Sequence, residues 1–352
     1  MTIAPVRIRP VAPEVRGSVD TLAPAPSAGG ADARRRWWLW ARLLGGVAIL
    51  AVVVWRLGTG PFVDGVRMVD GWSLAAAAGI ALLTTVFCAW RWSLVAGGLG
   101  VGLPLRTAVA AYYRSQFLNT TLPGGVLGDV HRAVRHGRDV GDVGRSVRAV
   151  AAERSAGQVV QILVTTIVLV LLPSPVRSFV PVVAAAVLVC GVGVVLAGRV
   201  LPRQGSSRPA RAVRMVAADL RYGLLARRAW PGIVLASVLV VAGHTTTFLI
   251  AARTAGSAAS PVRLLPLALI VLVAMGIPAN VGGWGPREGV AAWVFAAAGL
   301  GADQGVATAV VYGVMALVAN LPGAVILIAG WRHRDRHEQP AIAVGVGGAA
   351  RG

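Results

Sequence analysis

Long apolar runs separated by short polar or arginine-rich stretches make up most of this sequence. Six of the runs are close to the roughly 20 residues that a helix needs to cross a bilayer. The pattern therefore predicts an all-α, polytopic helical membrane protein with six full spans, at residues 37–57, 72–96, 156–172, 179–197, 233–252 and 306–329.

Two further apolar segments are broken by proline, several glycines and an acid–arginine pair. Residues 105–127 lead into a break at residues 119–129, and residues 264–300, too long for one span, are interrupted at residues 278–289. Backbone that leaves a helix at membrane depth needs protein or water to satisfy its polar groups. One such break in each half of the chain is typical of a transporter-like substrate site.

The composition supports the membrane assignment and narrows the choice of partners. Hydrophobic residues form 56% of the chain and charged residues 14%, with a mean hydropathy of +0.70. The net charge of +20 comes from arginines beside apolar spans, where they set topology and attract anionic lipid. We therefore expect membrane lipids, and no nucleic acid, as partners. Because motifs for nucleotide, metal or nucleophile chemistry are missing from the sequence, we also expect no bound cofactor.

Arginine clusters predict the orientation in the plasma membrane. Clusters at residues 34–36, 129–154, 199–228 and 331–336 are expected on the cytoplasmic side, which places both termini there. The first broken segment must then enter and leave on that side, as a re-entrant hairpin. The second must begin and end outside, either as a hairpin or as two thin spans. One hairpin from each face suggests an inverted repeat, which is a hypothesis. Around the membrane domain at residues 34–334, we expect disordered cytoplasmic tails at 1–33 and 335–352.

The first break offers a phosphate site. Gly124, Gly125 and Gly128 permit backbone conformations closed to other residues, and the helix that restarts there presents unpaired N–H groups to an anion. Asp129 and Arg132 lie three residues apart, on one helical face. The competing interpretation is a plain cytoplasmic loop whose helix cap is Asp129.

The second break carries the same argument. Gly282 and Gly283 interrupt any regular helix, and Arg287 and Glu288 follow at once. Arg287 is a candidate for binding lipid phosphate, with Glu288 pairing it or relaying a proton. Trp284 is a candidate for stacking on a headgroup, and equally for anchoring the chain at the membrane interface.

Other polar residues within or beside apolar runs complete the set of candidate substrate-binding positions. Arg114 either faces a cavity or an acid, or extends to the cytoplasmic interface. Glu153 and Arg154 head the third span, and Asn119 opens the first break. Gln161 and Thr165 follow on one face of the third span, where we expect helix packing.

At these positions the chain resembles a known family, the flippase-like integral membrane proteins related to the transmembrane region of lysylphosphatidylglycerol synthase. Leu127 and Pro286 depart from the family pattern. The resemblance covers about residues 34–334 and is carried by Asn119, Leu122, Pro123, Gly124, Gly128, Asp129, Arg132, Glu153, Arg154, Gly157, Ile277, Pro278, Gly282, Gly283, Gly285, Arg287, Glu288 and Gly289.

The resemblance implies a helical domain that moves anionic or aminoacylated phospholipid between leaflets. Only some 20 residues follow the last span, so we expect no soluble aminoacyl-transfer domain and no lipid lysylation by this chain alone. The leading hypothesis is a lipid flippase in which Arg132, Arg154 and Arg287 hold the phosphate.

Two alternatives stay open. One is a membrane-embedded lipid or glycosyl transferase that uses Asp129 with Glu153 or Glu288. The other is a non-transporting partner of a lipid-modifying enzyme.

Overall fold

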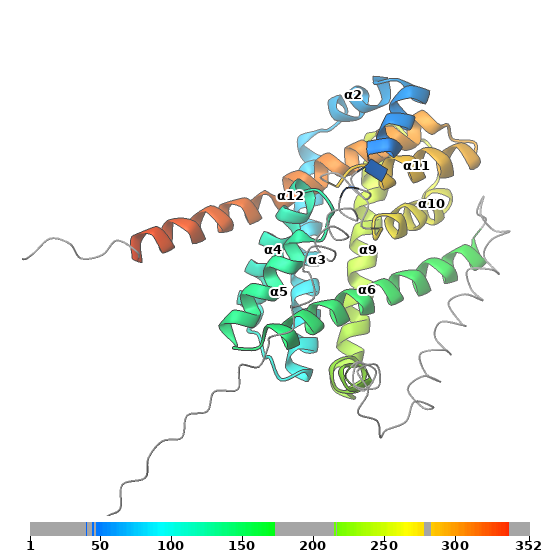
Figure 1. Ribbon diagram of the computed structural model, residues 1–352. Helices are drawn as coiled ribbons and strands as arrows, with labels where there is room; N and C mark the ends of the chain where they lie inside the picture. Colours follow the sequence, from blue (N-terminus) through cyan, green and yellow to red (C-terminus); the bar gives the residue numbers. More distant parts are fainter. Residues whose placement is uncertain are drawn as a thin grey trace, which may run out of the picture. The chain divides into compact units, whose positions relative to one another are not determined.

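The computed structural model describes residues 40, 44–45, 47–172, 215, 217–277 and 283–337, the last seven by backbone alone. The chain divides into two units, Met1–Leu39 and Trp40–Gly352. The first unit lies outside the described residues, and so does the predicted N-terminal tail at 1–33. Of the predicted C-terminal tail, residues 338–352 also lie outside them. The described elements of the second unit are helices (Figure 1): α2 (Gly60–Arg67), α3 (Gly71–Gly98), α4 (Leu105–Thr121), α5 (Leu127–Asp139), α6 (Val143–Leu171), a π-helix (Leu220–Leu224), α9 (Trp230–Thr254), α10 (Pro261–Ala274), α11 (Pro286–Ala297) and α12 (Ala302–His337).

Four helices of the described chain are long and apolar enough to cross a membrane: α3, α6, α9 and α12. They overlap four of the six predicted spans. Helix α6 begins at Val143, whereas the span was predicted from residue 156, so Glu153 and Arg154 lie inside this helix and not at its head. The described part of the first span, Val47–Leu57, is bent by 96° relative to α2, and the two reach the required length and hydropathy only together. The span predicted at 179–197 lies outside the described residues, and the six-span count stays a prediction.

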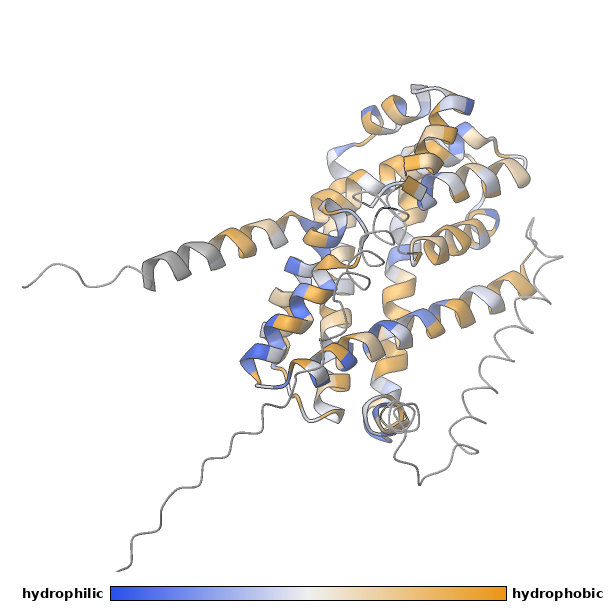
Figure 2. Ribbon diagram, in the orientation of Figure 1, coloured by the Kyte–Doolittle hydropathy of each residue, from blue (hydrophilic) through white to orange (hydrophobic). Residues whose placement is uncertain are grey.

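Each broken segment forms a pair of short helices that pack against each other, α4 with α5 and α10 with α11. At 1.5 Å per residue these helices are roughly 18–26 Å long, less than the ~30 Å hydrocarbon core of a bilayer. The first pair extends further than predicted, because α5 continues to Asp139 whereas the sequence pattern ended the hairpin at residue 127. In Figure 2, α5 carries many hydrophilic residues, which explains why hydropathy alone missed it.

Local sequence sets the helix ends. The Asp70 carboxylate accepts a hydrogen bond from the Ser73 backbone N–H (2.6 Å) at the start of α3, and Asp142 does the same for Arg145 (2.8 Å) at the start of α6. Pro286 is the first residue of α11, a position that needs no hydrogen-bond donor and suits the fixed φ of proline. The Pro286 departure from the family pattern is therefore compatible with a helix start.

The helices pack closely through small residues. α3 packs most extensively against α9, and α12 contacts α2, α3, α4, α9 and α11. A Cβ built on Gly323 of α12 would lie 2.2 Å from the Tyr113 carbonyl oxygen, so α12 and α4 approach to backbone contact there. One apolar core gathers around Phe248, Phe295 and Tyr312, and a second around Trp92 and Tyr112. Such small-residue contacts are what holds helices together in lipid.

Gly128 lies inside α5, and its role differs from the one predicted. Positive φ angles occur at Gly124 (93°) and Gly125 (62°) in the break itself, whereas Gly128 is helical. A Cβ on Gly128 would lie 2.0 Å from the Ser115 carbonyl oxygen. The residue therefore permits the close approach of α5 to α4 rather than an unusual backbone conformation.

We expect Gly128→Ala to lower the free energy of unfolding by about 1–3 kcal/mol, because an added methyl group must push two backbones apart. Thermal unfolding in detergent micelles, followed by circular dichroism, measures this. Gly79→Ala is the matched control: it lies inside α3 with open space around its Cβ position, so it should be neutral or stabilising. Equal melting temperatures for the two variants would contradict the packing role.

Candidate functional site

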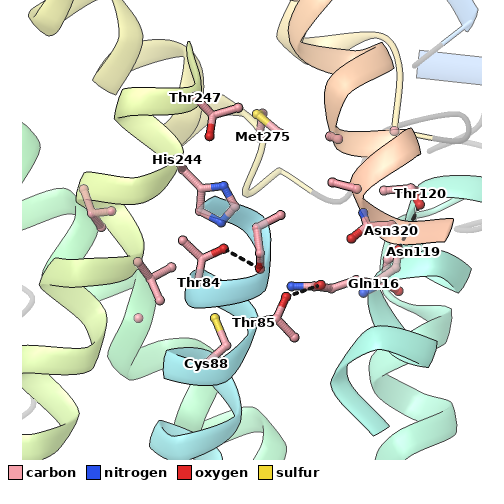
Figure 3. A pocket seen from close by; sticks show the side chains of 18 of the residues that line it. Thr84, Thr85, Cys88, Gln116, Asn119, Thr120, His244, Thr247, Met275 and Asn320 are labelled. Carbon is pink, nitrogen blue, oxygen red and sulfur yellow. Dashed lines mark hydrogen bonds between the residues drawn. The ribbon is translucent and has the colours of Figure 1, made fainter. Parts of the chain in front are cut away.

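A polar cavity of about 290 Å³ lies among the long helices and is lined by parts of both breaks. Figure 3 shows His244 and Thr247 of α9 on one side and Gln116, Asn119 and Asn320 on the other. Thr84 and Thr85 of α3 lie between these two sides, and the Thr85 hydroxyl donates to the Gln116 side-chain oxygen (3.0 Å). A cavity lined by hydroxyls and amides between apolar helices is a candidate site for a polar ligand.

Both breaks reach this cavity. Asn119 and Gly125 line it from the first break, and Gly283, Pro286 and Arg287 line it from the second. The two breaks also touch, because a Cβ built on Gly283 would lie 3.8 Å from the carbonyl oxygen of Thr120. Segments more than 150 residues apart in the chain thus share one wall of the cavity.

The charged residues that line the cavity all carry positive charge. Arg91, Arg154 and Arg287 contribute guanidinium groups, and the lining residues found in the described chain include no aspartate or glutamate. The Arg154 side chain is 48% exposed, whereas those of Arg91 and Arg287 are about 5% exposed. Arg154 is therefore the most accessible of the three to a ligand.

Glu153 of α6 lies behind this wall and forms ion pairs with two arginines from other helices. Its Oε1 accepts hydrogen bonds from Arg91 Nε (2.8 Å) and from the Tyr112 hydroxyl (2.9 Å), and its Oε2 accepts one from Arg132 Nη2 (2.8 Å). Glu153 is fully buried. A buried carboxylate with three charge-assisted or hydroxyl partners fixes α3, α4, α5 and α6 against one another.

Asp129 extends the same network toward the first break. Its carboxylate accepts from Arg132 Nε (2.9 Å), from Ser115 Oγ (3.2 Å), from Asn119 Nδ2 (3.2 Å) and from Arg154 Nη2. Asp129 is the third residue of α5, not its cap. Across the network three arginines meet two carboxylates, which leaves one positive charge beside the cavity.

The second break builds a separate ion pair. Arg287 donates from Nε (2.8 Å) and Nη2 (2.6 Å) to Glu288 Oε1, and Glu288 Oε2 accepts from the Gly285 backbone N–H (2.7 Å). The Arg287 guanidinium carbon lies 5.0 Å from the centre of the Trp284 ring and 5.7 Å from that of Tyr312, a cation–π arrangement. Trp284 also packs against the apolar cluster formed with Val53 and Val306.

Two glycines make room for the buried arginines. A Cβ on Gly157 of α6 would lie 2.8 Å from Arg91 Nη1, and one on Gly313 of α12 would lie 2.2 Å from Arg287 Nη2. In each case a guanidinium passes over a glycine of the neighbouring helix. This arrangement holds the side chain in place without requiring a second acid.

The structure distributes the predicted residues among different positions. Arg154, Arg287, Asn119, Gly125 and Gly283 line the cavity, as does Gln161, which was expected only in helix packing. Asp129, Glu153 and Glu288 do not line the cavity but form ion pairs with the arginines that do. Gly282 lies outside the described residues. Arg132 and Arg114 line a second pocket instead.

At the N-termini of the helices that follow the breaks, some backbone N–H groups already donate hydrogen bonds to side chains of the protein. The Gly128 N–H of α5 donates to Asn119 Oδ1 (2.7 Å), and the Gly285 N–H before α11 donates to Glu288. These N–H groups are therefore engaged, and the guanidinium groups are the cationic groups that face the cavity among the described residues.

Two residues of this arrangement were not predicted. Arg91 lies within the span at 72–96, where an arginine inside an apolar run is itself a signal of a functional or paired charge. It donates from Nη1 to Ser237 Oγ (3.0 Å) in addition to Glu153. In the sequence nothing distinguishes Tyr312 from its apolar neighbours in α12, yet in the structure its hydroxyl lies 3.1 Å from His244 Nδ1.

Comparison with protein families identifies the membrane domain. The family described as the lysylphosphatidylglycerol synthase TM region matches residues 39–323 of the chain. This chain belongs to that family. Comparison with curated proteins and with solved structures gave no match. Membership in the family makes the chain a membrane protein connected with lipids, as the sequence resemblance predicted.

Glu153→Gln should lower the free energy of unfolding by about 3–5 kcal/mol, because it leaves Arg91 buried without its counter-charge and Arg132 paired with Asp129 alone. Thermal unfolding of the detergent-solubilised protein measures the loss. The control is Asp142→Asn, which breaks a pair with Arg145 whose side chains are 42–45% exposed (3.3 Å) and should cost under about 1 kcal/mol. Similar losses for the two variants would exclude a central structural role for Glu153.

Proposed function

We propose that this protein moves a phospholipid, or another lipid with a charged headgroup, between the two leaflets of the membrane. The observation that supports this most directly is a polar cavity with three guanidinium groups and no carboxylate among its described lining residues. Guanidinium groups bind phosphate oxygens in a fixed, often bidentate geometry. Arg154, Arg287 and Arg91 are the proposed phosphate ligands.

The size and polarity of the cavity favour a headgroup over a whole lipid. About 290 Å³ is at the lower end of small-molecule sites, so the acyl chains would remain in the surrounding lipid while the headgroup enters. Hydroxyl and amide side chains such as Thr84, Gln116 and Asn320 suit the glycerol or aminoacyl groups of anionic or aminoacylated phospholipids.

In the proposed mechanism, the two broken segments are the parts of the protein that move. Short helical pairs that meet at a polar site are the arrangement in which one half of a transporter rocks against the other. The contact between Thr120 and Gly283 is the point at which such a movement would open or close the cavity. We place the protein in the plasma membrane with both termini cytoplasmic, as the arginine distribution predicts.

The transferase alternative receives less support from the geometry. Asp129, Glu153 and Glu288 are each held by ion pairs with arginine and do not line the cavity. A general base must reach the proton that it removes, and these carboxylates face arginines instead of the cavity. The third alternative, a non-transporting partner of a lipid-modifying enzyme, is separated from transport by the following experiment.

In proteoliposomes, Arg154→Gln should slow the transfer of fluorescent phosphatidylglycerol to the outer leaflet by about tenfold or more, because it removes a charge-assisted contact to phosphate worth roughly 1.5–3 kcal/mol. Dithionite quenching of the outer-leaflet fluorophore follows the transfer. Wild-type protein that does not accelerate transfer over empty liposomes would exclude the transport proposal.

Arg148→Gln is the matched control for this measurement. Arg148 lies on the same helix, pairs with Asp219 (2.9 Å) and does not line the cavity. It should leave the transfer rate unchanged. If both variants slow transfer equally, the cavity arginine is not the phosphate ligand.

A further inference from the structure

A second basic pocket lies on α4 and α5, away from the central cavity. Its volume is about 410 Å³, and the α4 residues Arg106 and Arg114 face the α5 residues Arg132 and Arg135 across it. Asp139 is the one acid among its described lining residues, and His131 and His136 complete its polar surface. Arg132 is already paired with Asp129 and Glu153, so three further arginines stand against one carboxylate in this pocket, and this balance favours an anion.

Arg132 lines this pocket from a buried position. The residue is 1% exposed, its Nε and Nη2 are bonded to Asp129 and Glu153, and its Nη1 has no hydrogen-bond partner. A buried donor without a partner carries the full cost of its desolvation. Here the Trp92 and Tyr112 rings, centred 4.6 and 4.3 Å from the guanidinium carbon, offset part of that cost. Because Nη1 is shielded from the pocket, Arg132 contributes positive charge to it without touching a bound anion.

An apolar groove adjoins the basic pocket and shares Arg106 and Ala110 with it. The groove, about 510 Å³, runs over α3, α4 and α12 and is lined by Ala78, Leu82, Val109, Val318 and Ile326 among others. A site with an arginine-rich end and an apolar end matches one molecule with both characters, an anionic amphiphile.

We propose that an anionic phospholipid binds here, with its phosphate between Arg106 and Arg135 and an acyl chain in the groove over Ala78 and Leu82. This lipid is distinct from the one that the central cavity is proposed to move, and its binding requires no transport. The predicted topology places the site on the cytoplasmic side, where anionic lipids concentrate. Free phosphate would fill the basic pocket only and leave the groove without a role.

Photo-labelling of the purified full-length chain tests the basic end. The probe is phosphatidylglycerol with a diazirine on one acyl chain, and mass spectrometry maps the labelled peptides. We expect labelling of α3 and α12 around Leu82 and Ile326, reduced on the order of tenfold in Arg106→Ala/Arg135→Ala, since each arginine near an anionic headgroup contributes about 1 kcal/mol. Phosphatidylcholine with the same diazirine should label these peptides weakly.

Arg138→Ala is the matched control, because Arg138 is exposed on α5 and does not line the pocket. It should leave labelling unchanged. An equal decrease in Arg138→Ala, or equal labelling by the two lipids, would overturn the proposal in favour of general attraction to the basic surface.

The apolar end is tested with a pair of α3 variants. Ala78→Trp fills the groove and should abolish labelling at these peptides, whereas Ala75→Trp, exposed on the same helix but outside the groove, should not. Excess unlabelled phosphatidylglycerol should compete with the probe, and inorganic phosphate should not. Competition by phosphate together with full labelling of Ala78→Trp would overturn the lipid assignment.

Discussion

The buried Glu153 carboxylate is the interaction on which the rest of the site depends. It compensates Arg91 of α3 and Arg132 of α5 at once, and it also accepts from Tyr112 of α4. In an environment that penalises any unpaired charge, the two arginines can remain buried only if these four helices keep their positions. The same carboxylate therefore fixes the helical framework and sets the positive character of the cavity wall.

Much of the fold could be predicted from the sequence, because apolar runs of membrane length have few alternatives to a spanning helix. The Asp129–Arg132 pair was equally accessible, since its spacing of three residues places both on one helical face and the ion pair is present. Helix α5 was not accessible by hydropathy. The arginines of α5 are typical of a cytoplasmic loop, and only the packing of α5 against α4 and α6 shows that Arg132 is buried.

The candidate site was predictable as two breaks but not as one cavity. Pairs such as Arg91–Glu153 and Arg154–Asp129 join residues 62 and 25 positions apart, and no local pattern announces such pairing. The role of Gly157 and Gly313, which leave space for guanidinium groups from other helices, follows from the same long-range contacts. Sequence therefore identified which residues are unusual, and tertiary packing decided which of them share a surface.

The pairing of Arg91 with Glu153 also has a consequence for biogenesis. Arg91 precedes its partner by 62 residues, so on the ribosome α3 is complete well before α6 exists. During that interval α3 must enter the membrane with an uncompensated arginine, at a cost of about 2.5–3.5 kcal/mol if the residue lies at the helix centre. The remainder of α3 is apolar enough for the helix to cross a membrane by length and composition even with this arginine. The ion pair therefore forms only after the segment that carries Glu153 has been synthesised, and it joins α3 to α6 at that stage.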